Sequence, residues 1–498
     1  MKIVLAIENQ DLRPEAAWLL HTLFADVAPE VTLGVTDYGG DLSAVVDDQT
    51  VLLTWGEAQP DVARLPRRPA VVIHVAADSA FHRSRRTPEA TPAELAFEGL
   101  SALTFYHQNL QDEGVRAEGQ RRWRLSGDVL ATVFSVLARL EEWENGPRDQ
   151  FDRYDEKHGY LMRYGLATRP VVDEVRALLD RLIEHAWTPV PRRSLWNGRR
   201  AAMFLGHDVD HVRYSTPKGL LKHPWRTARL TGRWREGWRS LRQVLWGFSH
   251  RRSDPYFSYY YLLRLYRHLH IRGTFFVIPR RTHRLEPYDL LSEDDLIRAL
   301  TALAVRVNAE IGLHASFAGG RGGAEFERDL AAFHKAFAYG PDGMRSHYLR
   351  FFWPDTPRAL EAAGVHYDST LGFSAIEGFR CGTSRPFFLF DVERRRPTNV
   401  LEIPLLLMDS TLMYHRRYST EEAMEKSLAL LRTVHTYNGV FTLLWHTEAL
   451  LCPLWTPWRR GVLLPLLREG LRASSGFLTG EQINLRCRAM YHPMPENL

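Results

Sequence analysis

The sequence of 498 residues predicts an α/β protein in two parts, each built on a sheet. Two observations lead to this prediction. Short β-branched runs alternate with helical segments through residue 76, and a longer alternation of the same kind begins after residue 200. Strands that alternate with helices favour a parallel sheet, either open or closed into a barrel.

The first part, residues 1–190, is expected to begin as a small α/β sheet with a helix at 14–24, where apolar residues recur at helical spacing. From about 125 to 187 the pattern becomes helical, with apolar stripes opposite charged faces. Prolines and arginines at 188–200 indicate a linker. The candidate strands are KIVLAI (2–7), VTLGV (31–35), TVLLTW (50–55) and AVVIHV (70–75).

The second part, residues 200–475, carries the longer alternation, and residues 476–498 are expected to be a C-terminal tail. Its candidate strands are AAMFLG (201–206), GTFFVI (273–278), AEIGLH (309–314), GMRSHYL (343–349), VLEIPLLL (400–407) and VFTLLWH (440–446). Charged or imidazole side chains end many of these strands: Asp208 and Asp210, His314, Arg345 with His347, and His446. Because the carboxyl ends of parallel strands meet at one edge, we expect these side chains to line an active site.

Composition limits the class of protein. The chain is 45% hydrophobic and 25% charged, which is ordinary for a soluble globular protein, and its net charge of +5 is too small to indicate nucleic-acid binding. Its first residues are too acidic for a secretory signal, and no window approaches the roughly 20 apolar residues of a membrane span. Cys381, Cys452 and Cys487 lack any C-x-x-C spacing, so we expect a cytoplasmic protein without a disulfide framework or a zinc knuckle.

The strand-end side chains suit metal-assisted hydrolysis. An Asp and a His from different strands can bind zinc, while a second Asp takes a proton from water and a further His protonates the leaving group. Residues i and i+2 of an extended segment point the same way, so Asp208 and Asp210 can both face the pocket while Val209 faces the core. A single Asp or His in such a place is more often a helix cap or a structural residue, so the prediction depends on the whole set.

Six segments within roughly residues 200–450 resemble, in order, the motifs of the polysaccharide deacetylases, which are carbohydrate esterase family four or the NodB-homology superfamily. They are FLGHDVDH, RGTFFV, EIGLHASF, GMRSHYLRF, YDSTLGF and LLWH. The chain looks like the branch with an additional N-terminal α/β region. The resemblance implies a distorted (β/α) barrel that removes N- or O-linked acetyl groups from a carbohydrate or glycoconjugate.

The resemblance assigns catalytic roles to four positions. It implies that Asp208 is the base, that Arg345 holds the carboxylate of this base, and that His446 is the general acid. It also implies that Asp368 tunes the acid histidine.

The resemblance further implies that Asp210 and His314 bind a divalent metal, expected to be zinc. Leu443 is the expected wall of the acetyl-methyl pocket, and Trp445 is expected to contact the substrate. The second metal-binding histidine of the family is absent, because Ala318 stands in its place. His347, His207 and His211 are the alternatives for the third ligand. A degenerate sugar-binding protein and a metal-independent amidase are therefore alternative functions.

Residues 213–253 form a basic insertion with eleven Lys and Arg residues against Glu236 alone up to residue 252. An apolar stripe at helical spacing runs through Trp234, Trp238, Leu241, Leu245 and Phe248. The favoured interpretation is a lid that packs on the barrel, since most amphipathic helices cover their own core. The alternative is contact with an anionic partner or a membrane surface, which would place the protein at the inner face of the membrane. No nucleic-acid partner is expected, because no binding motif accompanies the arginines.

Overall fold

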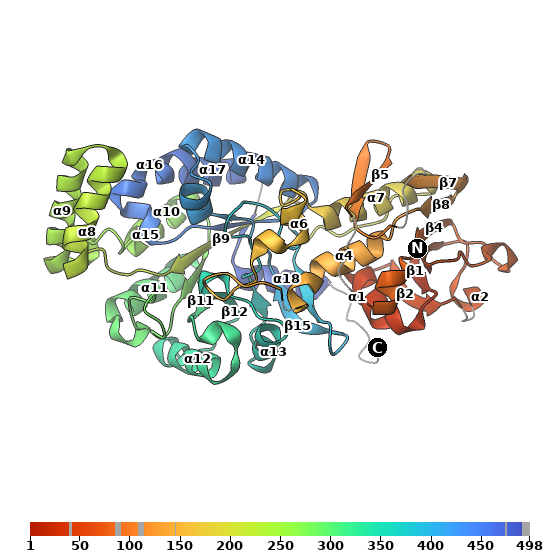
Figure 1. Cartoon of the computed structure of the whole chain (residues 1–498), viewed down its shortest axis with the longest axis horizontal. Coiled ribbons are helices and arrows are strands. Elements are labelled where there is room, and N and C mark those ends of the chain that lie inside the picture. Colours follow the sequence, from red (N-terminus) through yellow and green to blue (C-terminus); the bar gives the residue numbers. More distant parts are fainter. Residues whose placement is uncertain (39–41, 85–90, 108–113, 145, 474–475, 491–498) are drawn as a thin grey trace.

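The structure is a computed structural model that describes residues 1–38, 42–84, 91–107, 114–144, 146–473 and 476–490. Figure 1 shows an elongated molecule with the N-terminal sheet at one end. The paired helices α8 (Pro217–Thr231) and α9 (Trp234–Ser249) lie at the opposite end, beyond the second sheet.

The N-terminal sheet has six strands in the order β2-β1-β3-β4-β8-β7, all parallel to their neighbours except β7. Its central strands are buried along almost their whole length, as expected for apolar parallel strands with both faces covered. The four predicted strands are confirmed to within two residues. The bounds are β1 (Lys2–Ile7), β2 (Thr32–Asp37), β3 (Thr50–Gly56), β4 (Val71–Ala76), β7 (Val115–Gly119) and β8 (Arg122–Leu125), with a separate hairpin of β5 (Ala93–Phe97) and β6 (Leu100–Thr104).

The helices of this part follow the predicted pattern with one break. The helical pattern around residues 127–145 divides at Arg139, whose φ of 54° is left-handed, and Asn145 lies outside the described residues. The bounds are α1 (Arg13–Leu23), α2 (Leu42–Val45), α3 (Ser79–Ser84), α4 (Val129–Leu137), α5 (Leu140–Trp143), α6 (Tyr160–Arg163) and α7 (Val171–Ala186).

The second sheet is a curled, distorted barrel whose strand path is β14-β15-β13-β12-β11-β10-β9-β17-β16, with β18 also paired to β9. Every pairing is parallel except that of β14 with β15. The bounds are β9 (Ala202–Val209), β10 (Thr274–Val277), β11 (Glu310–Ala315), β12 (Gly343–Ser346), β13 (Tyr367–Asp368), β14 (Phe387–Asp391), β15 (Arg396–Glu402), β16 (Leu407–Met408), β17 (Val440–Leu444) and β18 (Gly476–Leu478).

Helices surround this sheet. They are α10 (Tyr259–Leu269), α11 (Asp294–Val307), α12 (Gly323–Phe337), α13 (Asp355–Ala362), α14 (Thr420–Thr436), α15 (Glu448–Leu451), α16 (Thr456–Trp458), α17 (Leu464–Arg472) and α18 (Gly480–Met490). Within the described ranges, none of the helices combines the length and the apolar character that a bilayer crossing requires. The three cysteines are free and buried.

Several predicted boundaries need correction. The strand expected at 400–407 divides into the end of β15 at Glu402 and the start of β16 at Leu407, and the strand expected at 343–349 ends at Ser346. Residues 476–490, expected to be a tail, form β18 and α18 and belong to the barrel, because β18 pairs with β9. The rest of the predicted tail, 491–498, lies outside the described residues. The predicted strand 201–206 continues to Val209, so Asp208 lies inside a buried strand rather than after it.

The two parts pack tightly in spite of the predicted linker. Nε1 of Trp18 donates a hydrogen bond to the carbonyl of Phe388 at 2.9 Å, and Oγ1 of Thr383 donates to the carboxylate of Asp173 at 2.7 Å. Apolar residues of both parts also form one continuous buried cluster. The N-terminal part is therefore fixed against the barrel and can contribute to its site.

Candidate active site

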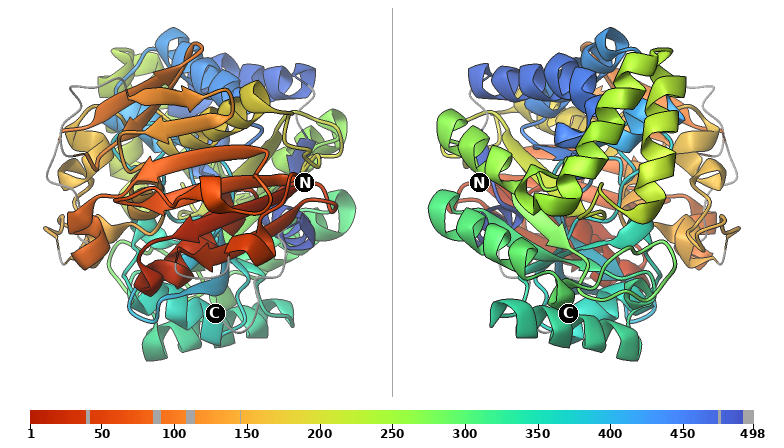
Figure 2. Two further views of the ribbon diagram at one scale, coloured as in Figure 1. Left: turned by 90° about the vertical axis from the view of Figure 1, so that its right-hand side faces the viewer. Right: turned by 90° about the vertical axis from the view of Figure 1, so that its left-hand side faces the viewer.

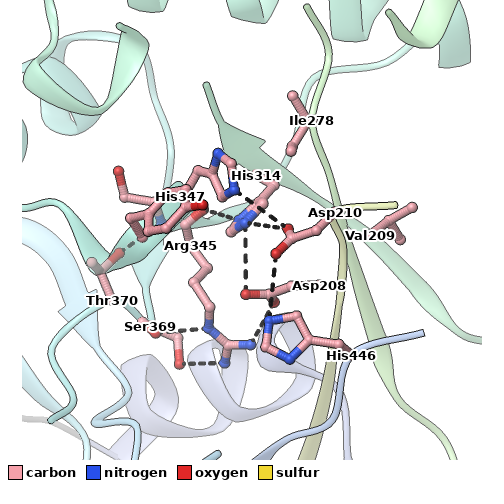
Figure 3. Close-up of polar contacts among 12 residues, drawn as sticks. Asp208, Val209, Asp210, Ile278, His314, Arg345, His347, Ser369, Thr370 and His446 are labelled. Carbon is pink, nitrogen blue, oxygen red and sulfur yellow. Dashed lines mark hydrogen bonds and ion pairs between the residues drawn. The ribbon is translucent and has the colours of Figure 1, made fainter. Parts of the chain in front are cut away.

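Polar side chains from several barrel strands meet at the carboxyl edge of the sheet (Figure 3). They belong to the run β12-β11-β10-β9-β17, whose strands are all parallel. β9 contributes Asp208 and is followed by Asp210, β11 contributes His314, β12 contributes Arg345 and is followed by His347, and β17 is followed by His446. The structure thus brings together the side chains that the strand-end pattern singled out.

Asp208 is held by the fully buried guanidinium of Arg345. Nη1 of Arg345 donates to Oδ1 of Asp208 at 2.9 Å, while Nε and Nη2 donate to the carbonyl and hydroxyl oxygens of Ser369 at 2.9 and 3.0 Å. Gly206 leaves room for this guanidinium, because a Cβ there would lie 2.6 Å from Nη1. Oδ2 of Asp208 lies 3.7 Å from Nε2 of His314. One carboxylate oxygen is therefore fixed by Arg345, and the other faces the side chains of the site.

Asp210, His314 and His347 form a set of three metal-ligand types. One carboxylate oxygen of Asp210 and one ring nitrogen of each histidine lie within 4.8 Å of one another. Nδ1 of His314 lies 2.7 Å from the carbonyl of Arg345, and Nδ1 of His347 lies 3.4 Å from Oε1 of Glu286. Because a carbonyl or carboxylate oxygen accepts, each Nδ1 carries the hydrogen, and each Nε2 turns its lone pair toward Asp210.

This arrangement fits a divalent cation. Nε2 of His314 and of His347 lie 3.2 and 3.8 Å from Oδ1 of Asp210, and this buried oxygen accepts no hydrogen bond of regular geometry. Lone pairs that face a carboxylate repel it unless a proton or a metal lies between them. Burial raises the pKa of Asp210, but positive charge on the imidazoles of His347, His314 and His446 outweighs burial and holds it below the usual range, so this carboxylate favours a cation beside it. Two imidazoles and one carboxylate are a donor set that zinc accepts.

His446 lies on the other side of Asp210, with its Nε2 3.5 Å from Oδ2. Its Nδ1 donates to Oδ1 of Asp409 at 2.6 Å, and its backbone N–H donates to Oδ2 of Asp409 at 3.0 Å. Burial alone would lower the pKa of His446, but the carboxylates of Asp409 and Asp210 outweigh it and raise the pKa well above its usual value. His446 is thus fixed in orientation and favoured as the imidazolium.

The placement of Asp368 corrects the expectation that it tunes His446. Asp368 is fully buried, and its carboxylate accepts hydrogen bonds from the backbone N–H and hydroxyl of Thr370 at 2.8 and 2.7 Å. Asp409, which directly follows β16, holds the histidine instead. Asp409 also follows apolar residues at a strand end, but its strand has only two residues, so the strand-end pattern did not single it out.

The side chains open into a pocket of about 480 Å³. Leu444 lines this pocket, whereas Leu443 packs in the hydrophobic core, so the predicted apolar wall moves by one residue along β17. Neighbouring residues of a strand point to opposite faces, which accounts for the shift. The side chain of Trp445 is fully buried in the core and does not line the pocket. Met408 and Met413 add to the apolar lining.

The other two candidate ligands lie apart from the metal set. His207 is fully buried, with Nδ1 2.5 Å from the carbonyl of Trp445 and Nε2 2.6 Å from the hydroxyl of Tyr266. Burial lowers the pKa of His207 to about 4, so it is a neutral structural residue. His211 lines the pocket beside Tyr256 but lies outside the three-residue set. Of the three alternatives for the missing ligand, the structure places His347 with Asp210 and His314.

The N-terminal part contributes one wall of the pocket through Gln150, Phe151 and Arg153. The ring of Phe151 stacks on Tyr348, with centroids 4.5 Å apart, and Nη1 of Arg153 donates to the carbonyl of Tyr348 at 2.9 Å. Tyr348 follows His347 and has a left-handed φ of 61°. The N-terminal segment therefore supports the backbone next to a candidate ligand. The sequence pattern held no signal for this contact, since it joins residues far apart in the chain.

Comparisons with known proteins give one family and several structures. The matching family model is a family of unknown function (DUF7033), over residues 49–188, which includes the pocket residues Gln150, Phe151 and Arg153. No curated protein matches the sequence. The chain is similar to the structure of a putative polysaccharide deacetylase from Mycobacterium smegmatis, with 20% identity, a TM-score of 0.40 and coverage of 59% of this chain and 91% of that chain.

Two further solved structures are similar. One is a probable polysaccharide deacetylase from Pseudomonas aeruginosa PAO1, with 13% identity, a TM-score of 0.41 and coverage of 60% of this chain and 95% of that chain. The other is the Puue allantoinase, with 14% identity, a TM-score of 0.40 and coverage of 60% and 94%. What the pocket does therefore has to follow from its own side chains.

Proposed function

We propose that the protein is a metal-dependent hydrolase that removes N- or O-linked acetyl groups from a carbohydrate or glycoconjugate. The observation that carries this proposal is the arrangement around Asp210. An Asp–His–His ligand set lies between a carboxylate held by arginine and a histidine held by aspartate. The order of the sequence motifs, which resembles that of the polysaccharide deacetylases, supports the same class of reaction.

Each of these side chains has a task in the hydrolysis of an acetyl group. Asp208 accepts a proton from the attacking water through Oδ2, because Oδ1 is occupied by Arg345. His446 donates the proton on Nε2 to the departing amine or hydroxyl, and Asp409 keeps the ring in the correct tautomer. Water adds to the acetyl carbonyl carbon, the C–N or C–O bond breaks, and acetate leaves with the deacetylated sugar.

Asp210, His314 and His347 would hold the metal. A bound divalent cation supplies Lewis-acid polarisation of the acetyl carbonyl and a lower pKa for water. Glu286 orients His347. Burial alone would raise the pKa of Glu286, but its hydrogen bonds with His347 and with backbone N–H groups outweigh burial and lower the pKa to about 2. A carboxylate behind a ligating histidine fixes the tautomer and raises the basicity of the ligand.

Leu444, Met408 and Met413 give the pocket an apolar wall suited to an acetyl methyl group. Gln150, Arg153 and Ser410 add polar groups that suit sugar hydroxyls. The degenerate protein and the metal-independent amidase were alternatives because Ala318 stands where the family has its second metal-binding histidine. His347 can take the place of that missing ligand beside Asp210 and His314. The geometry therefore favours a metal-dependent enzyme over both alternatives.

Acetate release tests the proposal. The purified protein is incubated with 4-nitrophenyl acetate and with N- and O-acetylated oligosaccharides, before and after chelation and with zinc restored. We expect acetate from at least one oligosaccharide, loss of activity on chelation, recovery with zinc, and no activity in His446→Gln. Full turnover by the chelated protein, or by the variant, would contradict the mechanism.

A further inference from the structure

The α8–α9 hairpin carries apolar side chains that no other part of the described chain covers. Trp234 and Trp238 of α9 are 74% and 66% exposed, and Leu221 and Trp225 of α8 are exposed as well. The stripe that was expected to pack on the barrel as a lid instead faces outward, with only Leu241 partly buried. The lid interpretation is therefore wrong for this stripe.

A different face of α9 is buried against the rest of the chain. Gly237, Ser240, Val244 and Gly247 are the buried residues of this helix, at spacings of three and four. A Cβ on Gly237 would lie 2.9 Å from the carbonyl of Pro224 in α8, so the two backbones approach closely. Gly237 thus packs against α8, whereas Ser240 and Val244 contact Tyr214 and Gly247 faces Ser215, both outside the hairpin, and the tryptophans stay exposed. Figure 2 (right) shows the two helices side by side at the surface.

Exposed apolar surface is concentrated here. Among the residues that the structure describes, the exposed tryptophans all belong to the hairpin: Trp225, Trp234, Trp238 and Trp246. Leu221, Leu230, Leu245 and Phe248 of the same hairpin are exposed as well. Exposed apolar surface that is concentrated on one pair of helices marks a contact site for another molecule or for a membrane.

The charge of the hairpin indicates the kind of partner that this surface binds. Lys and Arg side chains flank the tryptophans, and the single acidic residue of the hairpin, Glu236, pairs with Arg239 at 2.7 Å. The exposed basic residues are Lys218, Lys222, Arg229, Arg233, Arg235, Arg239 and Arg242. Tryptophan beside arginine suits the interface of a bilayer, where the indole lies at the level of the headgroups and the guanidinium meets lipid phosphate.

We propose that the α8–α9 hairpin binds the surface of a membrane that contains anionic lipids. Its apolar face enters the headgroup region, and its basic residues contact the negative surface. Each arginine near such a surface increases partitioning roughly fivefold, so several of them make the contact depend strongly on lipid charge and on salt.

The hairpin also adjoins the mouth of the candidate active site. A groove lined by Trp225, Arg229 and Trp458 shares Arg226 and Trp455 with the active-site pocket. Docking through the hairpin would therefore bring the pocket close to the membrane. If the proposed deacetylase activity is correct, on which this step alone rests, the substrate is an acetylated glycan attached to lipid or held at the membrane surface.

Vesicle sedimentation tests the proposal with the full-length protein. We expect it to sediment with phosphatidylcholine vesicles that contain phosphatidylglycerol, and far less with phosphatidylcholine alone. The double variant Trp234→Ser/Trp238→Ser should lower the partition coefficient by about tenfold or more. Its matched control replaces exposed apolar residues elsewhere, Val305→Ser/Leu485→Ser, and should sediment like the wild type.

The charge is tested separately. Arg235→Ser/Arg242→Ser should weaken binding to the anionic vesicles by roughly tenfold or more, and added salt should weaken wild-type binding in the same direction. The control pair Arg298→Ser/Arg472→Ser removes exposed arginines of α11 and α17 and should have little effect. Circular dichroism verifies that each variant is folded.

Three outcomes would overturn the proposal. The first is that the wild type stays in the supernatant with anionic vesicles, and the second is that the tryptophan variant sediments as the wild type does. The third is a dimer, detected by light scattering, that the tryptophan variant abolishes while vesicles bind neither protein; the occupant of this surface would then be a second copy of the chain. Acetate release from 4-nitrophenyl acetate should be unchanged in these variants, so failure of membrane binding and failure of the proposed activity are distinguishable.

Discussion

The two ends of strand β11 carry polar side chains in opposite situations. At the amino end, Glu310 accepts hydrogen bonds from the hydroxyls of Tyr367 and Thr274, each at 2.7 Å, and from the backbone N–H of Glu481 at 3.0 Å. At the carboxyl end, His314 satisfies only Nδ1 and turns Nε2 toward two carboxylates. Polar groups that saturate one another stabilise the barrel, and polar groups left facing a pocket can do chemistry.

A substitution at Asp208 is the most direct test of whether the carboxyl end of the strands, and not the amino end, carries the activity. Asp208→Asn keeps an oxygen for the guanidinium of Arg345 but removes the proposed base, so we expect activity to fall by about 10²- to 10⁴-fold while the fold is retained. Acetate release and circular dichroism measure the two effects. Glu310→Gln, the control at the other end of the sheet, should leave activity within about twofold of the wild type. Similar losses in both variants would remove the distinction between the two ends.

The second test asks which aspartate supports His446. Asp409→Asn should lower kcat by about 10²-fold or more, because the amide no longer fixes the tautomer that presents Nε2–H to the leaving group. Asp368→Asn is the control, since this carboxylate is bound to Thr370 rather than to His446. A larger loss in kcat for Asp368→Asn than for Asp409→Asn would restore the assignment that the sequence motif implied.

The third test concerns the ligand set. His347→Ala should weaken zinc binding by about 100-fold or more, since one of three ligands is lost, whereas His211→Ala should leave it nearly unchanged. Titration with zinc and metal content by mass spectrometry of the purified proteins measure this. If His211→Ala loses the metal and His347→Ala retains it, the ligand set is wrong.

The strand pattern predicted much of the fold and the edge that carries the site. Buried parallel strands are apolar along their length, so β1, β3, β4 and β17 are visible in the sequence, and a polar residue at the end of such a strand stands out. Asp208, Asp210, His314, Arg345 and His446 carried this signal, and the structure brings them together. The pattern of apolar residues predicts a strand and the position of its carboxyl end, since both are local properties of the chain.

The remaining features depend on contacts between distant segments. Asp409 follows a strand of only two residues, which is too short for a periodic signal. Leu443 was predicted to line the pocket but Leu444 does, because a shift of one residue changes the face of a strand to which a side chain points. The contribution of Phe151 depends on docking of the N-terminal part against the barrel. The apolar stripe of α9 was visible, but sequence could not decide whether the stripe or the small-residue face of the same helix would be buried.

The last expected effect is on stability rather than on activity or metal binding, and it is a pH dependence at the amino end of β11. Burial raises the pKa of Glu310 from 4.5 to about 7, in spite of the hydrogen bonds that lower it. Between pH 4.5 and 7 the folded protein keeps this proton while the unfolded chain has lost it, so stability falls as pH rises through this window and then levels off. Glu310→Gln stays neutral and lacks this slope, and by pH 8 its free energy of unfolding should exceed that of the wild type by at most roughly 3 kcal/mol.

Urea unfolding across this range measures the difference, with the exposed carboxylate variant Glu327→Gln as control. Parallel stability profiles for wild type and Glu310→Gln would mean that Glu310 is ionised in the folded barrel, and that the amino end tolerates charge in the same way as the site does.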